Sequence, residues 1–493
     1  MNNKILLVEP AYKTRYPPLG LMKISTYHKM LGDEVVFVKG RNAEVRFQYW
    51  DRVYINTLFT WTWAETVKTI KYYHETLFNF SGKCFIGGIL ATLMPQELFN
   101  ETGIPPVIGL LDDPAKIEQG DDIIIDALAP DYNTLHQVEN EQFKYSYTDA
   151  YLGYATRGCI RKCDFCAVRT LEPHYVPYIN IGKMVKEINA SSGEKQNLIL
   201  MDNNILASKN FNEIIDDIKS AGFVNGATFG PTKRKMRVDF NQGLDARLLT
   251  EKKMKRLAEI PLEPMRIAFD SIEYKDAYIN AVRLAHKYGQ RDMSNYILYN
   301  FRDTPEDFYE RLLINIELNE EFRRENGSRT NIFSFPMRFI PLNAKTRTVS
   351  TGNLHWNHRY LRGVQAITNV ARGSVTPGSE FFFQAFGRNA QEFKSIISMP
   401  DTFIRLRLVD NWKTIQDYDR RLMPYIKDWM NTYNQLNQEE LGLLLNILGS
   451  NNKEVIKSQA KVVTNKKLAT LLEYHLEAED IVSKYKPEAK IKK

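Results

Sequence analysis

Three cysteines stand close together in the stretch Arg157-Gly-Cys-Ile-Arg-Lys-Cys-Asp-Phe-Cys166, and the chain has only one other, Cys84. Three thiolates at C-x3-C-x2-C spacing can bind three irons of a cubane [4Fe–4S] cluster and leave the fourth iron open to a small molecule. A structural zinc site would use four protein ligands, commonly from two separate cysteine pairs, and the sequence has no second pair. The spacing therefore predicts an iron–sulfur cluster on Cys159, Cys163 and Cys166.

The composition predicts a soluble protein. Of the 493 residues 43% are hydrophobic and 25% are charged, and no apolar run approaches the roughly 20 residues that cross a bilayer. Four cysteines, three of them in one loop, do not form a disulfide framework, so we expect a reducing cytoplasm and no membrane partner. The net charge of +7 permits an anionic partner such as nucleic acid but does not require one.

The cysteine stretch resembles the motif of the radical S-adenosylmethionine (radical SAM) superfamily. Phe165, directly before the last cysteine, fits the aromatic position of that motif. The resemblance implies an enzyme that binds a [4Fe–4S] cluster and S-adenosylmethionine. An electron from the cluster would cleave the cosubstrate to methionine and a 5′-deoxyadenosyl radical, which would act on a substrate that the sequence does not identify. The resemblance also implies an electron donor such as flavodoxin or ferredoxin.

Residues 1–130 alternate between apolar strand-like runs and helical patterns, which predicts a doubly wound parallel sheet. The expected strands are 4–8, 34–38, 52–56 and 83–86. The segments Pro17-Pro-Leu-Gly-Leu21 and Gly87-Gly88 resemble the cobalamin-binding domain of one large radical SAM class. However, the loop from Glu9 to Arg15 contains no histidine to ligate cobalt. We therefore expect a domain that covers the active site, with cobalamin binding as the less favoured alternative.

Residues 151–345 show six strand–helix units, which match the partial (β/α)6 barrel of radical SAM enzymes. The expected strands are 151–156, 198–201, 236–240, 265–269, 295–299 and 333–340. Residues 131–150 are predicted to form a linker, and residues 346–493 a mainly helical C-terminal domain. The fold class is therefore α/β, with a helical region at the end of the chain.

In such barrels, functional side chains stand at the carboxyl ends of the strands. Asp202 follows the second strand, where a carboxylate suits the ammonium group of the methionine moiety. Tyr299 ends the fifth strand, near the expected adenine position. The three candidates after the third strand have an alternative interpretation as a loop cap or a surface ion pair. The residues expected to bind S-adenosylmethionine are Phe165, Asp202, Asn203, Gln242, Asp245, Arg247 and Tyr299; no catalytic residue beyond these is proposed.

Several functional alternatives remain open at the level of the sequence. One is a cobalamin-dependent radical SAM methyltransferase, and another is a radical SAM enzyme that modifies nucleic acid. An alternative of a different class is a metal-stabilised interaction module without turnover, against which the polar residues at the strand ends count. Cys84 lies in a predicted buried strand, where a free cysteine behaves as a small hydrophobe, and it is assigned no role.

Overall fold

The structure is a computed structural model that describes residues 2–77, 82–117, 122–325, 329–348, 351–408 and 412–483. For residue 76 and residues 412–421 it describes the main chain alone. The chain forms two compact units. Unit 1 comprises residues 1–266, 287–290 and 340–349, and unit 2 comprises residues 267–286, 291–339 and 350–493. The domain boundaries expected at residues 130, 150 and 345 stay predictions.

Unit 1 begins with the expected doubly wound parallel sheet. Its strands are β1 (Lys4–Glu9), β2 (Glu34–Lys39), β3 (Arg52–Thr57) and β4 (Lys83–Gly88), in the order β2-β1-β3-β4. A further parallel bridge joins Gly87 to Val107. Side chains of β1 are buried on both faces, which is why the strand reads as a continuous apolar run.

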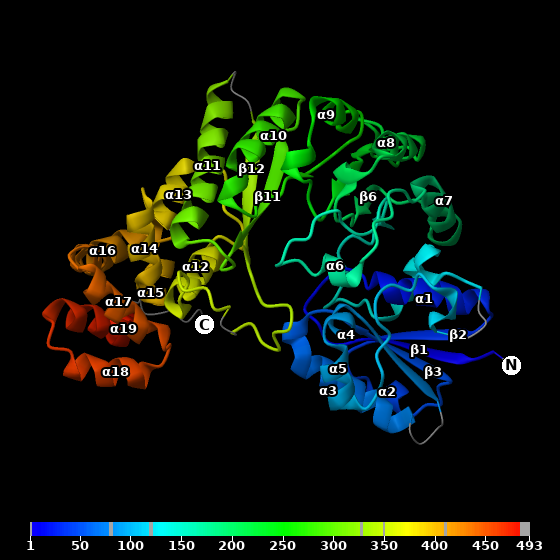
Figure 1. The fold of residues 1–493 in the computed structure, drawn as a ribbon, viewed down its shortest axis with the longest axis horizontal. Helices are drawn as coiled ribbons and strands as arrows, with labels where there is room; N and C mark the ends of the chain where they lie inside the picture. Colours follow the sequence, from blue (N-terminus) through cyan, green and yellow to red (C-terminus); the bar gives the residue numbers. More distant parts are fainter. Residues whose placement is uncertain are drawn as a thin grey trace. The chain divides into compact units, whose positions relative to one another are not determined.

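Helices cover both faces of this sheet. In Figure 1, α1 (Leu19–Met30) lies on one face, and α2 (Ala43–Arg46) and α3 (Trp63–Leu77) lie on the other. On the α3 face, Leu6 and Val8 of β1 share a core cluster with Val67 and Ile70. The remaining elements of this part are α4 (Ile89–Leu93), α5 (Pro95–Thr102) and the short 3-10 helices η1 (Thr60–Thr62), η2 (Pro114–Lys116), η3 (Ile125–Ala127) and η4 (Tyr132–Gln137).

A second parallel sheet in unit 1 supplies the first strands of the expected barrel. It consists of β5 (Ala150–Gly153), β6 (Asn197–Leu200) and β9 (Arg237–Phe240), in that spatial order. The register places Gly153 beside Leu200 and Leu200 beside Phe240, so the three carboxyl ends lie at one edge. The other elements are α6 (Val168–Leu171), α7 (Ile181–Ser192), η5 (Ile205–Ala207), α8 (Phe211–Ser220), β7 (Thr228–Phe229), β8 (Arg234–Lys235), η6 (Ala246–Leu248), α9 (Glu251–Leu257) and β10 (Met265–Arg266).

Unit 2 contains the two long parallel strands β11 (Asp292–Tyr299) and β12 (Asn331–Arg338). Helix α11 (Pro305–Arg324) packs on both strands, and three buried polar side chains spaced four residues apart join it to other segments of the chain. Arg311 donates to the carbonyl oxygens of Phe269, Asp270 and Leu298. Asn315 donates to Ser334 Oγ, and Asn319 bonds both main-chain groups of Ile332. The other elements here are η7 (Ile272–Tyr274) and α10 (Lys275–Lys287). The expected strand–helix order is therefore confirmed.

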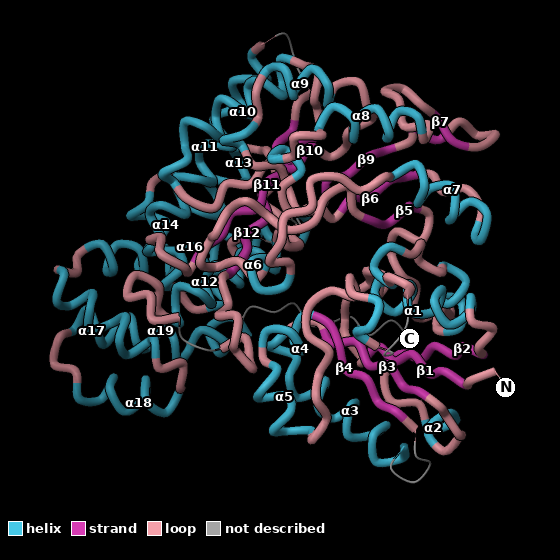
Figure 2. Tube along the Cα trace, turned by 45° about the vertical axis from the view of Figure 1, so that its right-hand side comes forward, coloured by secondary structure: helices cyan, strands magenta, loops and turns pink. Residues whose placement is uncertain are grey.

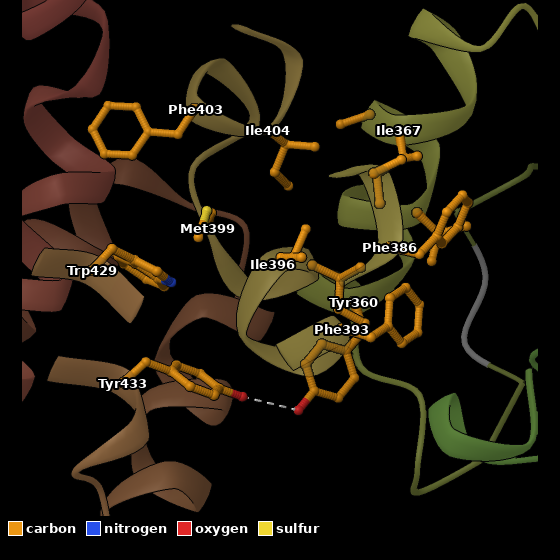
Figure 3. Packing of buried hydrophobic residues seen from close by; sticks show 14 of the residues in the cluster. Tyr360, Ile367, Phe386, Phe393, Ile396, Met399, Phe403, Ile404, Trp429 and Tyr433 are labelled. Carbon is orange, nitrogen blue, oxygen red and sulfur yellow. Dashed lines mark hydrogen bonds between the residues drawn. The ribbon is translucent and has the colours of Figure 1, made fainter. Parts of the chain in front are cut away.

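The rest of unit 2 is helical, as expected; Figure 2 shows helices and loops from α12 to α19. The core of this part includes Trp429, Phe393 and Phe386 (Figure 3). The hydroxyls of Tyr360 and Tyr433 lie 3.5 Å apart in it. The helices are α12 (His358–Val370), α13 (Ser379–Phe386), α14 (Ala390–Ser398), α15 (Asp401–Leu406), α16 (Trp412–Asn434), α17 (Gln438–Gly449), α18 (Lys453–Val462) and α19 (Lys466–Ser483).

Among the described residues, no helix combines the length and the apolar character that crossing a bilayer requires.

Candidate metal centre and cofactor site

The three cysteines lie on the loop that connects β5 to α6. Cys159, Cys163 and Cys166 are half-buried and form no disulfide. The base of the loop is closed by two main-chain hydrogen bonds between Arg157 and Val176, of 3.0 and 2.9 Å. Gly158 has φ +73°, and a Cβ at this position would lie 2.4 Å from the carbonyl oxygen of His174. The loop therefore requires glycine directly before its first cysteine.

Asp202, at the carboxyl end of β6, holds the start of this loop. Its side chain is 1% exposed. The carboxylate accepts hydrogen bonds from the main-chain N–H of Ala155 (3.1 Å) and of Thr156, and from Thr156 Oγ1 at 2.6 Å. Burial raises the pKa of Asp202 to about 6, although these donors favour the ionised form. In the structure the oxygens of Asp202 bond the start of the cysteine loop. The expected contact of Asp202 with the cosubstrate ammonium stays a prediction.

A buried ion network lies behind the loop. Arg157 donates to both Asp126 and Glu172, each at 2.8 Å, and Lys23 of α1 also pairs with Asp126, at 3.1 Å. Burial by itself would raise the pKa of Asp126, but the charges of Lys23 and Arg157 hold that pKa below its ordinary value. The main-chain N–H of Gly158 donates to Glu172 at 2.6 Å. The network therefore connects a helix of the N-terminal sheet domain to the residue that precedes Cys159.

Asp245, after β9, joins the third strand to the cluster loop. Its carboxylate accepts hydrogen bonds from Arg161 Nε at 3.0 Å and from Arg247 Nε at 2.7 Å. Burial by itself would raise the pKa of Asp245, but the hydrogen bonds from Arg247 and Arg161 outweigh burial and hold this pKa below its ordinary value. One carboxylate thus accepts hydrogen bonds from two guanidinium groups beside the loop. The structure thus places Asp245 beside the cysteine loop, with Arg247 bonded to it. Their expected part in binding S-adenosylmethionine stays a prediction.

Asn204 contacts the sulfur of Cys159. Its side-chain Nδ2 lies 3.6 Å from Cys159 Sγ and 3.4 Å from Asp245 Oδ2. The residue is 3% exposed, and its Oδ1 is buried without a hydrogen-bond partner. A buried acceptor without a donor is costly and uncommon in folded proteins. This oxygen therefore marks a place where a ligand with an N–H or O–H group would be stabilised.

The other residues expected around the cosubstrate lie in different surroundings. Asn203 donates to Glu172 at 2.9 Å and so belongs to the ion network. Gln242 is exposed, and its Nε2 donates to Asn241 Oδ1 at 3.4 Å. Phe165 is half-buried in the turn between Cys163 and Cys166.

Tyr299, expected near the adenine, lies in a hydrophobic core in the structure. Its side chain is 3% exposed and belongs to the core of unit 2, with its ring 4.9 Å from that of Phe308 and 5.3 Å from that of Trp356. Successive side chains of a strand point to opposite faces, and Tyr299 lies on the helix-covered face of β11. Its neighbour Leu298 is half-buried on the opposite face.

Three cysteines on one loop that form no disulfide are a donor set that can hold a cubane iron–sulfur cluster. The described part of the chain contains no group of three or more His, Cys, Asp or Glu side chains placed to hold one metal ion. In a cubane cluster each thiolate binds a different iron, so the three sulfurs need not converge on one point. Three half-buried cysteines on one loop, with hydrogen-bond donors at Cys159, meet that requirement.

The sequence did not single out Arg161, Glu172 or Asn204 for these roles. Arg161 lies inside the cysteine motif and Asn204 directly follows two expected site residues, so both could have been found from their position. Glu172 follows the last cysteine by six residues in a stretch without a recognisable motif, so no local pattern predicts its bond to Gly158.

The N-terminal sheet domain also approaches the strand ends of unit 1. Tyr16 lies in the loop after β1, and Asn241 directly follows β9. The hydroxyl of Tyr16 accepts a hydrogen bond from Asn241 Nδ2 at 3.1 Å. Tyr12 of the same loop is buried, with its hydroxyl 2.7 Å from Thr66 Oγ1. Gly88 has φ +111°, and a Cβ there would lie 2.2 Å from the carbonyl oxygen of Thr57. The close packing of β4 on β3 therefore accounts for the glycine at position 88, and no bound ligand is needed to explain it.

Comparisons with known proteins give structural likeness only. No protein-family profile and no curated protein matches the chain. A solved structure of the radical S-adenosylmethionine methyltransferase TsrM from Kitasatospora setae, with cobalamin and a [4Fe–4S] cluster bound, is 14% identical over 70% of this chain and 77% of that one, with a TM-score of 0.47. A second TsrM structure, with tryptophan substrate and a SAM analogue (aza-SAM), is 15% identical over 64% and 72%, with a TM-score of 0.48. The chain is thus similar to these structures, and their ligands belong to that enzyme.

Proposed function

We propose that this protein is a radical SAM enzyme. The observation that carries the proposal is the loop with Cys159, Cys163 and Cys166, held by Asp202 at the carboxyl edge of a parallel sheet. A cluster bound by these cysteines would supply one electron to S-adenosylmethionine and so generate a 5′-deoxyadenosyl radical. The substrate that this radical would attack is not identified by the residues described.

The side chains around the loop suit the charged end of S-adenosylmethionine. The Asn204 Oδ1 atom offers an acceptor for the methionine ammonium, in place of Asp202. The guanidinium groups of Arg161 and Arg247 lie beside the loop, and guanidinium groups suit the methionine carboxylate. These residues would hold the cosubstrate in one orientation, which is the main contribution that a protein makes to such chemistry.

Turnover of the cosubstrate tests the proposal. Anaerobically reconstituted protein, reduced with dithionite and given S-adenosylmethionine, is expected to release 5′-deoxyadenosine slowly, as measured by chromatography. Arg247→Leu is expected to weaken cosubstrate binding about tenfold to a hundredfold, because a charged hydrogen bond contributes about 1.5–3 kcal/mol. Arg237→Leu is the matched control, since Arg237 pairs with Glu263 and starts β9 at its other end.

Two results would contradict the proposal in different ways. Protein that carries the cluster but neither binds nor cleaves S-adenosylmethionine would favour an interaction module without turnover. Equal loss of binding in the Arg247 and Arg237 variants would mean that the cosubstrate does not lie beside Asp245.

A cobalamin-dependent radical SAM methyltransferase is the second candidate. The order β2-β1-β3-β4, with the added parallel bridge at Val107, supports the cobalamin-binding-like domain expected from the sequence. The loop after β1 still has no histidine for cobalt, and its Tyr12 is buried against α3. Modification of nucleic acid by the same chemistry is a further possibility, supported by the net charge of +7 alone.

Corrinoid retention separates the two main candidates. Protein mixed with hydroxocobalamin and then desalted is expected to keep little or no corrinoid absorbance, because the N-terminal domain offers no cobalt ligand in that loop. A Tyr12→His variant, treated in parallel, shows whether a cobalt-ligating histidine in this loop is enough to retain the corrinoid. Stoichiometric retention by the unmodified protein would contradict this expectation and make methyl transfer the leading chemistry.

A further inference from the structure

The sulfur of Cys159 accepts two hydrogen bonds in the structure. One donor is the main-chain N–H of Arg161, 3.3 Å away, and the other is the side-chain Nδ2 of Asn204, 3.6 Å away. The first donor belongs to the cysteine loop itself. The second comes from the loop after β6, so a side chain from a different strand end adjusts the surroundings of this sulfur.

The Asn204 side chain is fixed in place by its neighbours. Asp245 accepts from the same Nδ2 at 3.4 Å, and Asp245 is itself held by Arg161 and Arg247. The hydroxyl of Tyr175 donates to the main-chain oxygen of Asn204 at 3.2 Å. With 3% of its surface exposed, Asn204 has little freedom to turn away. Its N–H therefore already points at the sulfur before the electron arrives, and Asn204 need not rearrange on reduction.

We propose that Asn204 is a positioning residue that raises the reduction potential of the cluster through its N–H···S hydrogen bond to Cys159. The proposal rests on the proposed function, because it requires the cluster. A hydrogen bond to a cluster sulfur stabilises the more negative, reduced state, and such bonds are among the factors that set the potentials of iron–sulfur centres. Reduction of the cluster takes up one electron, which dithionite supplies in the titration. Removing the N–H is therefore expected to make the cluster harder to reduce.

The test compares Asn204→Leu with Asn203→Leu. The two changes are chemically identical and affect adjacent residues, but Asn203 donates to Glu172 and not to a sulfur. Reconstituted proteins of equal iron content are titrated with dithionite under anaerobic conditions, and the reduced cluster is followed by electron paramagnetic resonance. For Asn204→Leu we expect about a tenfold shift of the reduction equilibrium toward the oxidised state, equal to about 59 mV for a one-electron couple. For Asn203→Leu we expect no shift.

A second variant covers the case in which Asn204→Leu binds less iron. Asn204→Asp keeps the shape of the side chain but, when ionised, has no N–H to donate, so its potential is also expected to fall. Wild-type potentials in both Asn204 variants, or an equal fall in Asn203→Leu, would overturn the inference. Wild-type protein that binds no cluster would overturn the proposed function, and the inference with it.

Discussion

Replacing any one of Cys159, Cys163 or Cys166 with alanine is expected to abolish cluster binding. A cubane site open at one iron has only three protein ligands, and the other side chains around the loop are engaged in hydrogen bonds and ion pairs. Unmodified protein, reconstituted without oxygen, should bind about four irons and absorb in the visible region.

Cys84→Ala is the matched control, and it should bind the same amount of iron as the unmodified protein. Cys84 lies in β4, and burial raises the pKa of its thiol to about 12, so it stays protonated and unreactive. Iron, sulfide and zinc contents measured on all four variants show whether the three cysteines bind an iron–sulfur cluster. Stoichiometric zinc without sulfide in oxygen-free preparations would contradict the cluster.

The parts of the fold that the sequence predicted are those with a strong local signal. Strands β1 and β6 are buried on two faces, so they stand out as short apolar runs in the sequence. The cysteine motif is equally local. Asp245 and Arg247 could be singled out from the sequence because the carboxyl ends of neighbouring parallel strands lie at one edge of a sheet.

The features that the sequence did not reveal depend on packing between distant segments. Whether Tyr299 or Leu298 lies on the helix-covered face of β11 depends on the helices that cover it, and a shift of one residue reverses the assignment. The role of Asp202 depends on where the main chain of residues 155 and 156 runs. The ion network behind the loop joins residues 23, 126, 157 and 172, and no local pattern relates them.

Asp202→Ala is expected to disorder the cluster loop, and its effect on stability should be large. The change leaves two main-chain N–H groups and the Thr156 hydroxyl buried without their acceptor. An unsatisfied buried donor costs about 1–3 kcal/mol, so a total loss of roughly 3–5 kcal/mol is expected for the part of the chain that contains the loop. Thermal unfolding and iron retention measure the effect. Thr156→Val removes only the hydroxyl and should cost about 1 kcal/mol, and the exposed Asp122→Ala should cost almost nothing.

The pH dependence separates this role from direct contact with the cosubstrate. Burial raises the pKa of Asp202 from the ordinary 3.8 to about 6, so between these values the folded state binds more protons than the unfolded state. Stability contributed by this group is therefore greatest below about pH 4, and it declines by at most about 3 kcal/mol as the pH rises through 6. Asp202→Asn has no titrating group and should lack this decline in apo protein, where no cosubstrate is present. If the apo proteins show identical pH profiles while cosubstrate binding alone is lost, Asp202 faces the ligand and the loop is held by other contacts.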